Sequence, residues 1–120
     1  MISIDSFRDL CGHTSVPFDT PIENKLDFHV AQINQNFSIK PYTLRGLHYQ
    51  EEPHVQTKLV SCLHGSIYSV VEDIRPDSST FDKYTVGVLT DENQKSMYVH
   101  LKTLHMATLL LSRTRSCNGT

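Results

Sequence analysis

A chain of 120 residues can hold one domain with a modest core, and its 38% hydrophobic and 20% charged content is that of an ordinary globular protein. The formal charge of −2 excludes the strongly basic surface that binds nucleic acid or an anionic membrane, and no apolar run approaches the roughly 20 residues of a membrane span. There is no signal-peptide pattern, and the three widely spaced cysteines favour a reduced, cytoplasmic compartment without a cysteine-based zinc site.

The first 25 residues are expected to hold a short helix and a loop. In residues 3–11, apolar side chains recur near helical spacing after a possible cap at Asp5 or Ser6. Residues 12–25 contain two prolines and a glycine among scattered polar residues, which predicts a loop.

From Leu26 the pattern changes to the alternation of apolar and polar residues that is typical of β-strands. Turn-forming residues separate the apolar segments, and His64-Gly65 indicates a hairpin. Short strands at close spacing, with no helical pattern between them, predict an all-β fold, an antiparallel sandwich or barrel. The expected strands are residues 26–37, 42–50, 55–63, 66–74, 81–90 and 96–101.

The tail has a different character, because clear alternation ends near His100 and the last residues are polar and basic. We expect residues after about Leu111 to be poorly ordered. The chain therefore divides into a helix and loop at 1–25, a partial β domain at 26–111 and a tail at 112–120.

The stretch Leu44–Gln50, L-R-G-L-H-Y-Q, places His48 within an expected strand. Strict alternation puts Gly46 on the face of His48, where it leaves room for a ligand, and puts Arg45 on the other face. Lys58 lies on the next expected strand and could approach the same cavity, since neighbouring strands lie about 4.8 Å apart. A base beside a fixed cation can remove a proton next to a carbonyl group while the cation stabilises the enolate.

Other interpretations of these residues stay open at this point. A single histidine in a strand is more often structural, and the seven histidines of the chain raise the possibility of a metal site. However, no two histidines are separated by one residue, the spacing by which one strand supplies two ligands. Asp73 is either a buried, hydrogen-bonded carboxylate or the end of a strand. These residues alone predict a β-sandwich with a possible His48–Lys58 cavity and select no substrate.

Taken together, several segments resemble the dTDP-4-dehydrorhamnose 3,5-epimerases and related nucleotide-sugar epimerases. Each is weak alone, but their order and spacing are specific to the family. The segments are A-Q-I-N-Q-N-F-S (31–38), Y-T-L-R-G-L-H-Y-Q (42–50), K-L-V-S-C-L-H-G-S-I-Y-S-V-V-E-D-I-R (58–75), S-S-T-F-D-K-Y-T-V-G-V-L-T-D-E-N (78–93) and Q-K-S-M-Y-V (94–99).

The resemblance implies a cupin-like antiparallel β-jelly roll, incomplete in this chain, and a homodimer. It also implies epimerisation at C3, C5 or both of a dTDP-4-keto-6-deoxyhexose in deoxysugar biosynthesis, with no metal and no organic cofactor. By position, His48 is the expected base, Lys58 the group that stabilises the enolate, and Arg45 the contact to the nucleotide diphosphate.

Four further residues are carried over by the same resemblance. Gln32 and Asn34 match the strand that helps to bind the nucleotide, and Asp73 matches an acidic position near the base. His105 falls at the spacing of a family histidine, although its neighbours differ, and is expected to contact substrate.

The chain also departs from the family pattern. The family's N-terminal D-x-R-G-x-F segment, which reaches the partner subunit's nucleotide, is expected to be absent, and the family's proton-returning tyrosine and orienting carboxylate do not follow Val99. After Val99 the sequence reads H-L-K-T-L-H-M-A where the family has P-x-x-F-A-H-G. A shift of reading frame near His100 would explain the change, which sequencing the gene would test.

Two functional hypotheses follow from these departures. The first is an epimerase whose activity is impaired by truncation. The alternative is an inactive remnant, or a non-catalytic cupin module that binds a nucleotide sugar or a metal.

Overall fold

The computed structural model describes residues 1–27, 29–50, 56–100, 105–110 and 114–119. It contains strands β1 (Ile2–Ser3), β2 (Asp5–Asp9), β3 (Gly12–Val16), β4 (Ile33–Ser38), β5 (Leu44–His48), β6 (Lys58–His64), β7 (Ser66–Glu72), β8 (Tyr84–Thr90), β9 (Lys95–Val99), β10 (His105–Leu110) and β11 (Thr114–Gly119), and helix α1 (Thr20–Leu26).

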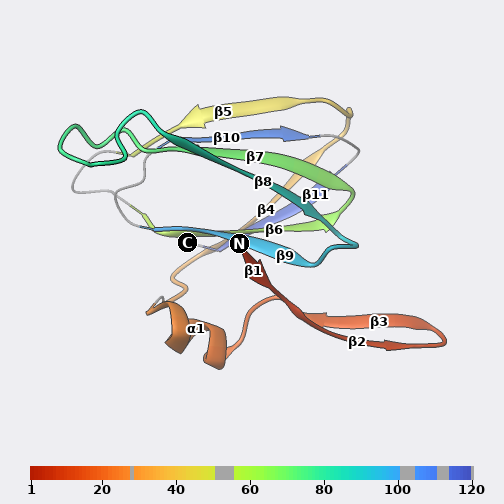
Figure 1. Ribbon diagram of the computed structural model, residues 1–120. Coiled ribbons are helices and arrows are strands. Elements are labelled where there is room, and N and C mark those ends of the chain that lie inside the picture. Colours follow the sequence, from red (N-terminus) through yellow and green to blue (C-terminus); the bar gives the residue numbers. More distant parts are fainter. Residues whose placement is uncertain (28, 51–55, 101–104, 111–113, 120) are drawn as a thin grey trace.

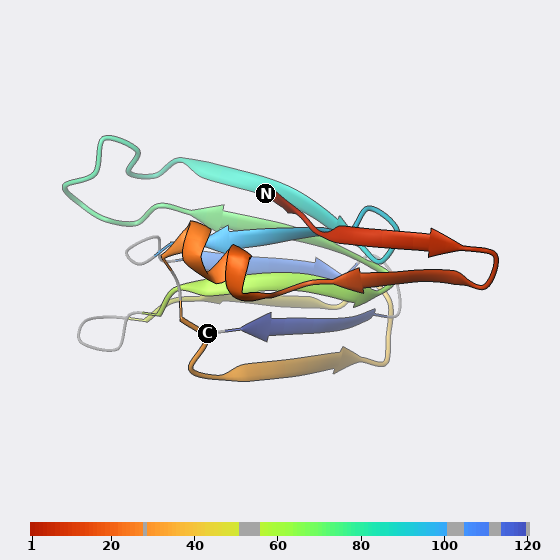
Figure 2. The same cartoon turned by 90° about the horizontal axis from the view of Figure 1, so that it is seen from below.

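Two antiparallel sheets face each other and form the body of the molecule (Figure 1). The larger sheet has five strands in the order β1-β9-β6-β11-β4, and the smaller sheet has four in the order β5-β10-β7-β8. The remaining strands, β2 and β3, form a separate hairpin that projects from the body, as Figure 2 shows from below. The predicted all-β, antiparallel sandwich is therefore confirmed.

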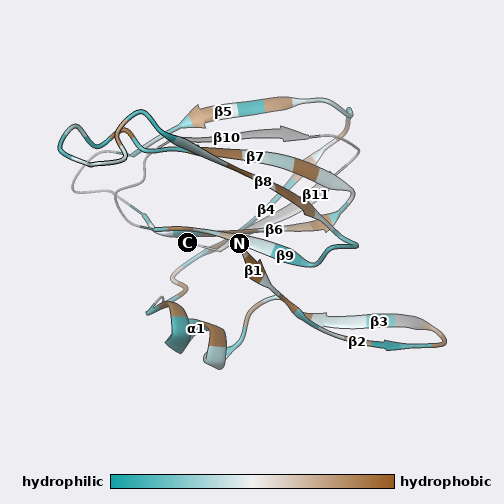
Figure 3. Ribbon diagram, viewed as in Figure 1, coloured by the Kyte–Doolittle hydropathy of each residue, from teal (hydrophilic) through white to brown (hydrophobic). Residues whose placement is uncertain are grey.

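The core lies between the inner faces, which are the faces that the two sheets turn toward each other. Along β7, buried and half-buried residues alternate, as expected for a strand with one face in the core. Figure 3 places hydrophobic segments on strands of both sheets. The buried apolar cluster comprises Val60, Cys62, Ile67, Val71, Leu89, Met97 and Val99.

The predicted hairpin at His64-Gly65 is wrong: β6 ends at His64 and β7 begins at Ser66, but the two strands belong to different sheets, so the turn crosses from one sheet to the other. Gly65 has a φ of 84°, a turn conformation that suits glycine. The expected strands at 66–74 and 81–90 also contain observed strands, β7 and β8, with shorter bounds.

The helix predicted at residues 3–11 is wrong. These residues form β2 and the turn into β3, with Asp5 opposite Val16 and Asp9 opposite Gly12. The Asp9 carboxylate accepts a hydrogen bond of 2.8 Å from the backbone N–H of Cys11, an interaction that stabilises the turn instead of a helix.

The helix instead lies within the expected loop, at α1. Asp19 caps it by accepting a hydrogen bond of 3.0 Å from the N–H of Ile22, Pro21 lies in its first turn, and Asp27 ends it in the left-handed conformation. The strand that was expected to begin at residue 26 is therefore shorter than predicted: α1 includes Leu26, and β4 begins at Ile33.

The expectation of poor order after Leu111 stays a prediction, although part of the tail has a place in the sheet. Thr114–Gly119 forms β11, which pairs with both β4 and β6 inside the larger sheet. The backbone N–H and C=O groups of β11 are thus paired with strands on both sides. The residue types of the tail alone did not predict this pairing.

No helix among the described residues is long and apolar enough to cross a membrane.

Candidate functional site

The pairing of β5 determines which of its side chains face the larger sheet. Arg45 lies opposite a β10 residue that in turn lies opposite Ser69 of β7. His48 lies opposite a second β10 residue, which is aligned with Val71. Directly opposed residues of antiparallel strands point to the same face, and Ser69 and Val71 are buried in the core. Arg45 and His48 therefore both occupy inner-face positions.

A β-bulge brings these two residues to one face. Three steps along β5, from Arg45 to His48, match only two steps along β10. Gly46, within the bulge, has a φ of 114°, which side-chain-bearing residues rarely adopt. The alternation expected from the sequence, with Arg45 and His48 on opposite faces, is wrong because of this extra residue. The two positions lie about 7 Å apart along the strand, from the rise of a β-strand.

Lys58 is on the facing sheet and not on a strand next to β5, so the predicted neighbouring-strand approach is wrong. β5 pairs with β10, whereas β6 pairs with β9 and β11. Lys58 alternates in register with Val60 and Cys62 of the core, which places it on the inner face of the larger sheet. β5 ends and β6 begins at the same end of the sandwich (Figure 1). Lys58 and His48 thus lie on facing sheets at one end.

Gln32 and Asn34 belong to the edge of the larger sheet. Asn34 is aligned through β11 with Val60, so its position is also on the inner face. The Gln32 side-chain amide donates a hydrogen bond of 2.7 Å to the Asn34 side-chain oxygen, and both residues are exposed. The structure therefore presents a polar amide pair on the same inner surface as the residues above.

Arg45 reaches from the smaller sheet to the edge strand of the larger sheet. Its Nε–H donates a hydrogen bond of 3.0 Å to the hydroxyl of Ser38, and one Nη2–H donates to the carbonyl oxygen of Phe37 at 3.3 Å. Sequence reasoning did not single out Ser38. The signal was present, since Gln32, Asn34 and Ser38 follow the period of two that places polar residues on one face of a strand.

The carboxylate of Asp73 is buried and accepts hydrogen bonds from residues of the turn that follows it. It accepts hydrogen bonds from the Nε of Arg75 at 2.8 Å, from the hydroxyl of Ser78 at 2.7 Å and from the hydroxyl of Thr80 at 2.6 Å. The Arg75 guanidinium first, and then the two hydroxyl groups, hold the pKa of this carboxyl well below its usual range despite its burial. Of the two interpretations left open for Asp73, the buried and hydrogen-bonded carboxylate is the observed one.

The backbone of His105 begins β10 opposite Glu72 and directly precedes the residue that pairs with His48. Its backbone therefore lies at the end of the sandwich where β5 ends. The structure describes only the backbone at this position, so the predicted substrate contact stays a prediction.

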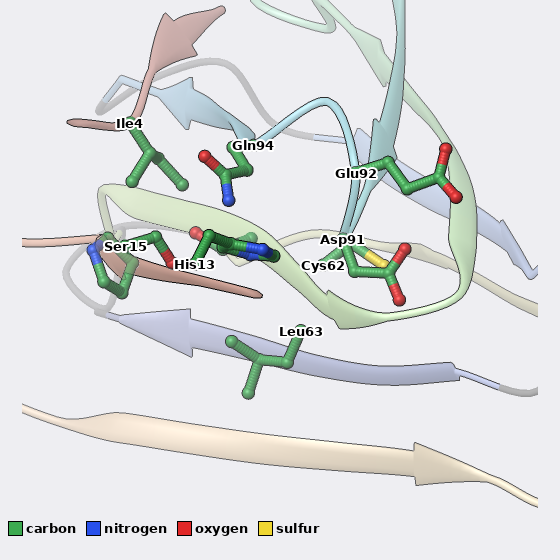
Figure 4. Close-up of a pocket in the computed structure, with 10 residues that line it drawn as sticks. Ile4, His13, Ser15, Cys62, Leu63, Asp91, Glu92 and Gln94 are labelled. Carbon is green, nitrogen blue, oxygen red and sulfur yellow. The ribbon is translucent and has the colours of Figure 1, made fainter. Parts of the chain in front are cut away.

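A cavity of about 330 Å³ lies elsewhere, between the β2–β3 hairpin and the larger sheet (Figure 4). The side-chain nitrogen of Gln94 points into it and is buried without a hydrogen-bond partner. None of the predicted site residues lines this cavity, which is bounded by Ile4, His13, Ser15, Pro17, Ser61, Cys62, Leu63, Asp91, Glu92 and Gln94. Within the described part of the chain, no three His, Cys, Asp or Glu side chains are grouped to hold a metal ion.

The family model for dTDP-4-dehydrorhamnose 3,5-epimerase matches residues 1–116. The chain belongs to this epimerase family. Two curated relatives carry the same description: the protein of Shigella flexneri is 40% identical over 82 residues, 68% of this chain, and that of Mycobacterium tuberculosis is 40% identical over 93 residues, 78% of this chain. The matches cover 44% and 39% of those relatives, so the chain spans less than half of their length.

Solved epimerase structures share the fold. The Bacillus anthracis enzyme, with TDP and pyrophosphate bound, is 28% identical with a TM-score of 0.88, and the match covers 98% of this chain and 68% of that one. The Legionella pneumophila enzyme, in complex with dTDP-4-keto-L-rhamnose, is 29% identical with a TM-score of 0.88 over 98% of this chain and 63% of that one. The predicted cupin-like jelly roll is thereby confirmed.

Proposed function

We propose that the chain is an epimerase domain that inverts C3, C5 or both of a dTDP-4-keto-6-deoxyhexose. The observation that carries the proposal is the inner-face placement of Arg45 and His48, with Lys58 on the facing sheet at the same end. Family membership supports the substrate class, because related structures hold TDP or a dTDP-keto sugar.

The proposed reaction needs a base and an electrostatic partner for the enolate. A proton on the carbon beside the 4-keto group passes to the imidazole of His48, and the electron pair of the broken C–H bond moves toward the keto oxygen. The ammonium of Lys58 stabilises the resulting enolate oxygen. A water molecule on the opposite face of the ring then donates a proton to the carbon as the enolate returns to the ketone, which inverts the centre, and the protonated His48 releases its proton to the solvent. No electrons are gained or lost, so the chemistry calls for no redox cofactor.

The separation of Arg45 from His48 suits this assignment. A guanidinium on the diphosphate and a base on the ring must be separated by roughly a sugar unit, and about 7 Å along β5 meets that requirement. Gln32 and Asn34 supply amide groups on the edge of the same surface for the nucleotide. Asp73 acts by shaping the turn after β7, and His105 is an additional candidate contact from β10.

A second candidate function is binding of the nucleotide sugar without turnover. Every residue of β5 is exposed, including His48. An open site keeps water around the base and the enolate, which weakens the electrostatic stabilisation that a closed site gives. In that case Arg45 and the amide pair would still bind the ligand.

Hydrogen exchange distinguishes the two functions. The chain is incubated with dTDP-4-keto-6-deoxyglucose in D₂O, and deuterium at C3 and C5 is followed by NMR. Exchange that disappears in His48→Ala, while dTDP binding persists, supports the epimerase. A folded, dTDP-binding chain without exchange supports binding alone, and stoichiometric metal with no nucleotide binding would contradict both.

The proposal includes a homodimer, supported by the projecting β2–β3 hairpin. Phe7 is 69% exposed and Leu10 is fully exposed on this hairpin, which gives it apolar side chains to place on a second subunit. Light scattering would show a dimer that Leu10→Asp weakens, and a monomer at all concentrations would contradict the assignment.

A further inference from the structure

We propose that Ser38 is a positioning residue, which holds the guanidinium of Arg45 in the orientation that binds the diphosphate of the substrate. The proposal rests on the proposed function and assigns a specific task to a residue outside the catalytic set. Ser38 acts through Arg45, so it is expected to affect nucleotide affinity and not the proton-transfer step.

The Ser38 hydroxyl lies in a buried environment. Ser38 is 5% exposed, and a buried hydroxyl without a partner is costly. It accepts the Nε–H of Arg45 at 3.0 Å, whereas Arg45 itself is exposed. A buried, fixed acceptor thus holds the side chain of an exposed arginine, whose many rotamers would otherwise be populated.

The hydrogen bond between Ser38 and Arg45 also connects separate parts of the fold. β4 and β5 are edge strands of different sheets, so the bond between Ser38 and Arg45 joins the two sheets at their edges. The connection between these strands has its own turn-closing hydrogen bond, from the Thr43 hydroxyl to the Lys40 carbonyl oxygen at 2.8 Å. The Ser38 contact is therefore not required to close that turn.

The contacts to Ser38 and Phe37 leave other N–H donors of the Arg45 guanidinium for a ligand. A guanidinium has five N–H groups, and here Nε–H and one Nη2–H are directed to Ser38 and to the Phe37 carbonyl oxygen. The N–H groups at the Nη1 and Nη2 end remain for a bidentate contact to phosphate oxygens. Anchoring one edge of the guanidinium reduces the entropy that is lost when the other edge binds.

The test is a double-mutant cycle on dTDP affinity, measured by titration calorimetry on the full chain. Ser38→Ala should weaken dTDP binding about 10-fold, because a hydrogen bond to a charged group is lost. Ser38→Thr, which keeps the hydroxyl, should stay within about 3-fold of the unaltered chain. In an Arg45→Ala background, Ser38→Ala should have no further effect beyond about 2-fold.

Catalysis gives a second readout. At saturating substrate, Ser38→Ala should exchange deuterium at the unaltered rate, while its KM rises in parallel with the dTDP dissociation constant. Ser61→Ala is a matched control, because Ser61 is also a buried serine whose hydroxyl is hydrogen-bonded, 2.6 Å from that of Ser96, and should leave dTDP affinity unchanged. If Ser38→Ala does not fold, Ser38→Cys keeps the size with a weaker acceptor and should show the same loss.

The results of these experiments distinguish a failure of the proposed function from a failure of the Ser38 role. An unaltered chain that folds but binds no dTDP overturns the proposed function and the role of Ser38 with it. If the unaltered chain binds dTDP and exchanges deuterium, but Ser38→Ala binds equally well, only the Ser38 role is overturned. The Ser38 role alone is likewise overturned if Ser38→Ala still weakens dTDP binding in the Arg45→Ala background.

Discussion

Lys58 and His48 lie on facing sheets at one end of the sandwich, and the proposed function assigns them separate tasks. Lys58 is half-buried in register with the core residues of β6, whereas His48 is exposed at the end of β5. A cation fixed by a packed strand needs little reorganisation when charge develops on the substrate oxygen, which is the condition for electrostatic catalysis.

Lys58→Ala is therefore expected to lower the rate of deuterium exchange about 100-fold, as the loss of one stabilising group for a developing oxyanion does. The dissociation constant for dTDP should change less than about 3-fold, because the nucleotide carries no enolate. NMR exchange rates and titration calorimetry measure the two effects. Lys95→Ala, an exposed lysine on β9, is the control and should change neither. A selective loss of dTDP affinity in Lys58→Ala would place Lys58 on the phosphates.

The depressed pKa of Asp73 leads to a prediction about how the free energy of unfolding depends on pH. Its folded-state pKa is depressed, so the ionised carboxylate stabilises the fold above its unfolded-state pKa of about 3.9, and this contribution is lost as the pH falls below about 4. Asp73→Asn should lower the free energy of unfolding by about 2 kcal/mol at pH 7, the order of a lost charged hydrogen bond.

Urea unfolding across pH 2.5 to 8 provides the measurement for Asp73. The difference between the unaltered chain and Asp73→Asn should shrink at the acid end. Asp77→Asn, at an exposed position in the same turn, should be nearly neutral throughout. A difference that stays constant with pH would exclude ionisation of Asp73 as the cause.

At the scale of the strand, the bulge in β5 is the feature on which the candidate site depends. Gly46→Ala places a side chain at a φ of 114°, which should destabilise the fold by about 1–2 kcal/mol and also weaken dTDP binding, since Arg45 and His48 lose their common face. Gly65→Ala is a matched control, because its φ of 84° carries a similar backbone penalty in a turn away from β5.

Thermal unfolding and calorimetry distinguish these glycine variants. We expect both to be destabilised, while only Gly46→Ala loses affinity for dTDP. Equal dTDP affinity in both variants would mean that the bulge does not position the site.

The strands and the candidate residues differed in how well the sequence could predict them. β7 and β8 were predictable because one face is buried and the alternation is local. α1 had a local signal, Asp19 with Pro21 after it, which the expectation of a loop overlooked. The shared face of Arg45 and His48 was not predictable, because it follows from pairing with β10, about 60 residues later in the chain.

At the scale of the whole molecule, the thiol of Cys62 reports on the integrity of the sandwich. Burial is the main cause that raises its pKa to about 11, so little reactive thiolate exists at pH 8. In contrast, Cys11 is exposed on the hairpin. Iodoacetamide should modify Cys11 quickly in the folded chain, and Cys62 only in denaturant, as peptide mapping by mass spectrometry would show. Equal labelling without denaturant would contradict a closed core.

The positions of β10 and β11 have a consequence for how the protein is made. β10 lies between β5 and β7 in the smaller sheet, and β11 lies between β6 and β4 in the larger sheet. During translation, β5 and β4 therefore emerge from the ribosome long before the strands that connect them to their sheets. Neither sheet can be completed until the segment that contains β10 and β11 has been synthesised, so assembly is late and depends on contacts between residues distant in sequence. In this fold, the surface that presents Arg45 and His48 is among the last parts to form.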